Sequence, residues 1–150
     1  PCPPFELGRA RAISVPADAR VAVFAYGTCV LDAAKAIDDL GPSLPVALYD
    51  ARFAKPVDVE LLRSLLDAGT PIVTVEDHGL EGGFGSCVVD GAADAGLDVR
   101  SIRRLGIPAR WIPHGSRSDQ KRQAGIDAAA IAAAVRELAD LGVAAPRPSV

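Results

Sequence analysis

Methionine is absent from this 150-residue chain, even at the first position. A sequence without an initiator indicates a processed chain or a fragment of a longer reading frame. The sequence also has no run of roughly 18 consecutive apolar residues, the length that a membrane-spanning helix needs. Its first residues do not have the composition of a signal peptide or a transit peptide. We therefore expect no association with a membrane, and we predict a cytoplasmic location.

Cysteine is scarce and poorly placed for chemistry. Cys2, Cys29 and Cys87 lie far apart and form neither a metal-ligand spacing nor a Cys-x-x-Cys pair. Cys29 and Cys87 are expected to be small, buried apolar residues, and reduced thiols are typical of the cytoplasm. A catalytic thiol would need a nearby base, and the chain offers only His78 and His114.

A concentrated positive charge is missing too. The formal net charge is −3, with 16 basic and 19 acidic residues interspersed along the chain. Nucleic-acid binding requires a clustered basic face. The local exception, Lys121-Arg122, is typical of a solvated helix surface. Nucleic acid is therefore not expected as a partner.

The chain does contain an ordered alternation of short apolar runs and helical patterns. Hydrophobic residues make up 49% and charged residues 23%, an ordinary globular composition for one domain. Strands are predicted at 9–15, 21–26, 45–49, 72–75 and 99–105, and helices at 30–40, 58–68, 86–95, 118–124 and 127–141. This alternation predicts an α/β fold with three α/β/α layers and a five-stranded, mixed but mostly parallel sheet.

Three boundaries follow from the same patterns. Residues 1–8, with three prolines, are predicted to be a linker, residues 9–142 the domain, and residues 143–150 a flexible tail. The first strand is expected to run antiparallel at one edge of the sheet. Thr28 and Asp58 are predicted to cap the helices that follow them.

Most of the notable polar residues fall where strands end, which is where ligands bind in open α/β sheets. The loops concerned are 27–28, 50–56, 77–85 and 106–117. The candidate interface or cleft residues in them are Asp50, Arg52, Phe53, Glu76, His78, Gly82, Gly83, Phe84, Gly85 and His114.

The glycine-rich segment 82–86 has two readings. Glycines before a helix can bind a phosphate through backbone N–H groups, but the spacing matches neither established phosphate-binding motif. The nearby carboxylates of Glu76, Asp77 and Glu81 would repel an anion. We favour a tight turn that lets the helix pack closely on the sheet or on a partner subunit.

The remaining candidates do not define a reaction. Glu76 and Asp77 point to opposite sides of an extended segment, and with His78 they lack a second cluster that would complete a metal site. Asp50 and Arg52 share a side if the segment is extended, which favours a local ion pair or a contact to a neighbouring subunit.

Several of these segments, in the same order, resemble the C-terminal domain of 1-deoxy-D-xylulose-5-phosphate synthase, a thiamine-diphosphate enzyme of the transketolase superfamily. The similarity spans roughly residues 5–141. The segments that carry it are 27–28, 50–58, 73–86, 105–108, 113–116 and 125–131. Two places depart from the family pattern: Ala109-Arg110 follows Pro108 where the family has aspartate, and Asp77-His78 stands where Glu-Asn or Glu-Glu is common.

The resemblance implies that the chemistry lies elsewhere in a longer enzyme. In the family, thiamine diphosphate and Mg²⁺ bind between two earlier domains, the first of which carries a Gly-Asp-Gly motif that this sequence lacks. The resemblance thus implies no catalytic, cofactor-binding or metal-binding residue here, and an isolated chain without activity. It further implies partners: N-terminal and middle domains, and a second copy in a homodimer reached through loops 50–56 and 77–86.

The parent enzyme would join pyruvate to glyceraldehyde 3-phosphate with loss of CO2, supplying isoprenoid and thiamine synthesis. Related C-terminal domains occur in transketolases and in 2-oxoacid dehydrogenase β subunits, so these remain alternatives. A stand-alone α/β module that binds a nucleotide or a phosphorylated ligand is the third.

Overall fold

A computed structural model describes residues 5–144 of the chain, with side chains up to residue 141. Cys2 and residues 145–150 of the predicted tail 143–150 lie outside the described residues. The strands are β1 (Arg11–Ser14), β2 (Val21–Ala25), β3 (Val46–Asp50), β4 (Ile72–Gly79) and β5 (Ile102–Ile107). The helices are α1 (Cys29–Leu40), α2 (Val59–Asp67), α3 (Phe84–Asp94), α4 (Arg117–Ala124) and α5 (Ala128–Ala144), with a short 3₁₀ turn at Val99–Ser101.

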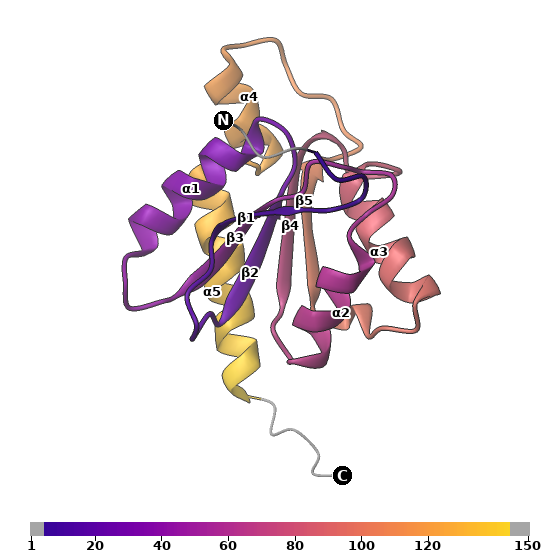
Figure 1. Ribbon diagram of the computed structural model, residues 1–150. Helices are drawn as coiled ribbons and strands as arrows, with labels where there is room; N and C mark the ends of the chain where they lie inside the picture. Colours follow the sequence, from indigo (N-terminus) through magenta and orange to yellow (C-terminus); the bar gives the residue numbers. More distant parts are fainter. Residues whose placement is uncertain (1–4, 145–150) are drawn as a thin grey trace.

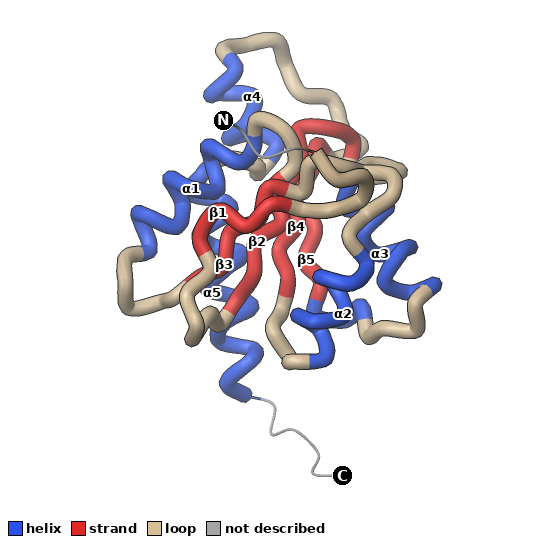
Figure 2. Tube along the Cα trace, viewed as in Figure 1, coloured by secondary structure: helices blue, strands red, loops and turns tan. Residues whose placement is uncertain are grey.

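The strands form one sheet in the order β1-β3-β2-β4-β5. β2, β3, β4 and β5 run parallel, and β1 pairs antiparallel with β3 at the edge. α1 and α5 cover one face of the sheet, and α2 and α3 cover the other (Figure 1). Figure 2 shows the strands as the layer between them. The predicted three-layer, mostly parallel α/β fold is confirmed.

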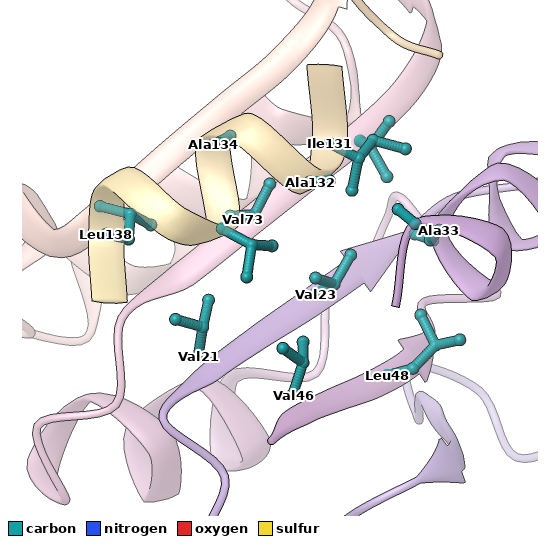
Figure 3. Close-up of a cluster of buried hydrophobic side chains, with 14 of the residues drawn as sticks. Val21, Val23, Ala33, Val46, Leu48, Val73, Ile131, Ala132, Ala134 and Leu138 are labelled. Atoms are coloured by element: carbon teal, nitrogen blue, oxygen red, sulfur yellow. The ribbon is translucent and has the colours of Figure 1, made fainter. Parts of the chain in front are cut away.

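The central strands form because they are apolar on both faces. All five residues of Val21–Ala25 are buried, and alternate side chains serve opposite layers. Valines and leucines of the sheet pack against α1 and α5, where the small side chains of alanines allow the helices to approach the sheet closely (Figure 3). The residues that meet there include Val21, Val23, Val46, Leu48, Val73, Ala33, Ile131, Ala132, Ala134 and Leu138.

Two strand boundaries differ from the sequence prediction by three residues or more. β4 continues to Gly79, beyond the predicted end at residue 75, because it pairs with β5 again at Gly79 and Ile107 after a local irregularity. β5 begins at Ile102 and not at residue 99, because the Asp98 carboxylate accepts the Arg100 N–H and bends the chain into the 3₁₀ turn. The first correction matters for function because it places 76–79 within the sheet.

The helix ends show one confirmed cap and one wrong one. The Asp58 carboxylate accepts the Leu61 N–H at 3.1 Å at the start of α2, as predicted. Thr28 precedes α1 but makes no side-chain hydrogen bond to the helix backbone, because its hydroxyl donates to Asp77 instead. None of the helices in the described part of the chain is long and apolar enough to cross a membrane.

Candidate functional site

The carboxyl edge of the sheet gathers the loops that the sequence marks as candidates. The turn after β2, the loop after β3 and the glycine-rich loop after β4 enclose an open cavity of about 300 Å³. Its lining includes Tyr26, Lys55, His78, Phe84 and the glycines of the loop. A second cavity of about 180 Å³ lies between β5, the loop that follows it and α4. In Figure 1 these loops cluster at the same end of the molecule as α4.

Glu76 is the residue that organises the glycine-rich loop. Its side chain is fully buried, and its two carboxylate oxygens accept the N–H groups of Phe84 at 2.5 Å and Gly85 at 2.6 Å. These N–H groups belong to the first turn of α3, where backbone donors lack helical partners and the helix dipole favours negative charge. A carboxylate from the strand therefore caps the helix, which is why α3 begins at Phe84, before the predicted residue 86.

The close approach of α3 to the sheet requires glycine at positions 83 and 85. A Cβ atom at Gly83 would lie 2.2 Å from Glu76 Oε2 and 2.3 Å from the Gly79 carbonyl oxygen. A Cβ atom at Gly85 would lie 2.8 Å from Thr74 Oγ1. The geometry supports the tight-turn interpretation, because the helix can approach β4 only where side chains are missing. The N–H groups that a phosphate would need are already occupied by Glu76.

Arg104 on β5 also stabilises this loop, and sequence reasoning missed it. Its Nη1 donates to Ser86 Oγ at 2.9 Å and to the Leu80 carbonyl at 3.4 Å. Ser86 Oγ in turn donates to that carbonyl at 3.0 Å and accepts the Gly82 N–H at 3.1 Å. The only signal in the sequence was the pair of arginines, Arg103 and Arg104, in a strand that is otherwise without charge.

Asp77 lies on the opposite side of β4 from Glu76 and forms a separate polar group. Thr28 Oγ1 donates to Asp77 Oδ2 at 2.9 Å, and Arg117 Nη2 lies 3.3 Å from the same oxygen. Partial burial alone would raise the pKa of Asp77. The hydrogen bond from Thr28, with the nearby charges of His78 and Arg117, outweighs burial and holds the pKa below its usual range. Asp77 is thus an ionised anchor that ties α1 to α4.

The two histidines lie in different places. The His78 ring is 5.7 Å from the Tyr26 ring, which stacks on Phe84 at 5.1 Å, so these rings form one wall of the larger cavity. His78 Nδ1 is 3.8 Å from Asp77 Oδ1, too far for a hydrogen bond. His114 is exposed in the loop after β5 and is not among the residues that line that cavity. The structure does not bring the two together.

The loop after β3 departs from the extended shape that the sequence suggested. Arg52 has a φ of 57°. The bend lets the Arg52 N–H donate to Asp50 Oδ1 at 3.1 Å, while Arg52 Nε remains 3.9 Å from Asp50 Oδ2. Phe53 follows, and its ring meets Phe5 edge-on at 6.2 Å. The predicted local ion pair is therefore a backbone turn with a long ionic contact.

Nucleophilic and metal chemistry find little support among the described residues. Burial raises the pKa of the Cys29 thiol to about 11, and the charge of Asp77 adds to the effect, so the thiolate is not available at neutral pH. Within residues 5–144, no three His, Cys, Asp or Glu side chains are grouped to hold a metal ion.

Comparison with known proteins places this geometry in a family. The model of the transketolase C-terminal domain matches residues 10–131, which include every loop of the carboxyl edge. This chain belongs to the transketolase C-terminal domain family. Among solved structures, this transketolase C-terminal domain is similar to a split-gene transketolase described as an inactive β4 tetramer, with a TM-score of 0.74 and 24% identity over 92% of this chain and 43% of that one. It is also similar to transketolase from Leishmania mexicana, with a TM-score of 0.61 and 19% identity over 88% of this chain and 18% of that one. At these identities the structures show the fold alone.

Curated relatives are more similar in sequence. The 1-deoxy-D-xylulose-5-phosphate synthase of Rhodopirellula baltica is 36% identical over 136 residues, covering 91% of this chain and 21% of the relative. The synthase of Magnetococcus marinus is 40% identical over 148 residues, covering 92% of this chain and 22% of the relative. The chain therefore spans about a fifth of the length of these synthases.

Proposed function

We propose that this chain serves as the C-terminal domain of a 1-deoxy-D-xylulose-5-phosphate synthase. The observation that carries the proposal is the identity of 36–40% to synthases across more than nine-tenths of the chain, compared with 24% or less to the transketolase structures. The parent enzyme would join pyruvate to glyceraldehyde 3-phosphate with release of CO2. The carbon–carbon bond chemistry would be supplied by thiamine diphosphate with Mg²⁺.

We propose further that this domain does not hold the cofactor. The glycine-rich loop does not fit a diphosphate, because Glu76 already occupies the N–H groups at the start of α3. Adding a second anion beside a buried carboxylate would cost free energy through repulsion in a region of low dielectric constant. The described residues also provide no cluster of carboxylates and histidines for Mg²⁺. The cofactor site would then lie in the other domains of the enzyme.

The role left for the carboxyl edge is assembly with those domains and with a second subunit. The candidate residues divide into two groups by burial. Glu76, Phe84 and Gly85 are buried. Together with Gly83 they fix the conformation of the glycine-rich loop. Asp50, Arg52, Phe53, His78, Gly82 and His114 retain exposed surface and form the contact surface that we propose.

Two experiments test this function. Reading the coding sequence upstream of Pro1 should reveal a Gly-Asp-Gly motif and a second α/β domain. The full-length protein should then form deoxyxylulose phosphate from pyruvate and glyceraldehyde 3-phosphate. A full-length protein that lacks this activity but transfers ketol groups between sugar phosphates, or decarboxylates a branched 2-oxoacid, would contradict the proposal.

A further inference from the structure

Arg52 combines two unusual features that the fold alone does not explain. Within residues 5–144 it is the one residue other than glycine with a positive φ, a conformation that bulky side chains rarely adopt. Its side chain is 9% exposed, and its Nε atom is buried without a hydrogen-bond partner. Strained backbone and unpaired buried donors concentrate at functional sites. Both features on one residue indicate that this arginine is held in place for a ligand.

The surroundings fix the guanidinium but do not pair Nε. The Arg52 backbone N–H donates to Asp50 Oδ1, which fixes the turn. Asp50 Oδ2 is 3.9 Å from Nε, beyond hydrogen-bonding distance. The guanidinium carbon lies 4.5 Å from the centre of the Phe5 ring, and Phe5 contacts Phe53 edge-on. The Phe5 ring therefore covers one face of the guanidinium without accepting a hydrogen bond in its plane.

The missing partner is expected to be a carboxylate. A guanidinium presents its donors in a planar fork that matches the two oxygens of a carboxylate. Arg11 lies opposite Asp50 in the pairing of β1 with β3, and Glu6, the acidic residue beside Phe5, is already paired with Arg9. Phe5 and Leu7 nearby are 74% and 73% exposed. An arginine among exposed apolar side chains is typical of the anchor of a protein interface.

We propose that Arg52, Phe5 and Phe53 form a carboxylate-binding site, occupied by an acidic side chain of the polypeptide that precedes residue 1 in the longer protein. The choice of occupant rests on the proposed function, in which this chain is one domain of a synthase about five times its length. Phe5 is the fifth residue of the sequence, and its ring lies on Arg52. Any preceding chain therefore approaches this corner at high effective concentration.

The site itself is tested on the 150-residue chain. The side-chain Nε–H resonances of its arginines are followed by NMR while sodium acetate replaces sodium chloride at constant ionic strength. The Arg52 resonance should shift and saturate, and that of Arg11 should not. A parallel titration with inorganic phosphate should give a weaker effect, since the fork matches a planar anion. An unsaturable shift, or an equal shift at Arg11, overturns the site.

The occupant is tested in trans. The polypeptide encoded upstream of Pro1 is expressed separately, and its binding to the chain is measured by calorimetry. R52K keeps the charge but loses the fork, so it should weaken binding about tenfold, while the matched variant R11K binds as the wild type does. Circular dichroism confirms that both variants are folded. Equal binding by R52K and wild type, or no binding by either, overturns the occupant. Synthase activity of the full-length protein is assayed separately, so failure of the site and failure of the proposed function are distinguished.

Discussion

Replacing Gly83 by alanine should destabilise this domain far more than the same change at Gly82, its neighbour. The two positions differ in the reason for glycine. Gly83 has a φ of −81°, which alanine adopts freely. Gly82 has a φ of +72° with no atom within 4 Å of a Cβ placed there. An argument from backbone conformation alone ranks Gly82 as the costlier site, and the packing argument ranks Gly83.

The magnitude follows from what the new methyl group meets. A Cβ atom at Gly83 would lie 2.2 Å from Glu76 Oε2, so either the carboxylate or the loop must move. Moving the carboxylate breaks two buried hydrogen bonds to Phe84 and Gly85, each contributing about 1.5–3 kcal/mol because the acceptor is charged. We expect G83A to lower the free energy of unfolding by about 3–5 kcal/mol. G82A should lower it by about 1–2 kcal/mol through left-handed strain alone.

Urea unfolding followed by circular dichroism measures both variants beside the wild type. Equal slopes against urea concentration would show that the unfolding transition exposes the same surface in all three proteins. If G83A is within about 0.5 kcal/mol of wild type, or if G82A is the less stable of the two, the capping role of Glu76 is wrong.

Three further changes probe the same edge of the sheet. E76Q should cost roughly 2–3 kcal/mol in urea unfolding, because the amide group offers one acceptor oxygen to two backbone donors. T28V should raise the pKa of Asp77 in a carboxyl NMR titration, because the hydrogen bond from Thr28 is removed. In the wild type the folded pKa of Asp77 is depressed, so the stability that Asp77 contributes is present above its unfolded pKa and is lost as the pH falls through the folded pKa. This acid-dependent loss of stability should be smaller in T28V. Cys29, with a pKa raised from 9.0 to about 11, should resist alkylation in the folded protein at pH 8. The contribution of this raised pKa to the stability of the fold is fully present below about pH 9 and is lost as the pH rises towards 11. C29A should therefore reduce the loss of stability at alkaline pH.

Much of this fold is predictable from local patterns. The run Val21–Ala25 is apolar throughout, so a strand covered on both faces is the one arrangement that buries it. Asp58 stands at the position from which a side chain reaches the first turn of a helix, and it caps α2 as predicted. These features depend on neighbours within a few residues of one another. Local sequence therefore carries enough information to place them.

The organisation of the site is less accessible because its partners are distant along the chain. Glu76 caps a helix that begins eight residues later, from within a strand, whereas capping rules examine the residue just before the helix. Arg104 meets Ser86 because of the register between β4 and β5. Thr28 has the right residue type for a helix cap, but its hydroxyl donates a hydrogen bond to Asp77 instead. In each case a tertiary contact displaced the local preference.

The central claim is that this domain supports an enzyme without holding its cofactor. Isothermal calorimetry of the 150-residue chain with thiamine diphosphate, in the presence and absence of Mg²⁺, tests it most directly. We expect no binding heat under either condition, because Glu76 occupies the donors at the start of α3. Magnesium-dependent binding with a dissociation constant in the micromolar range would contradict the claim.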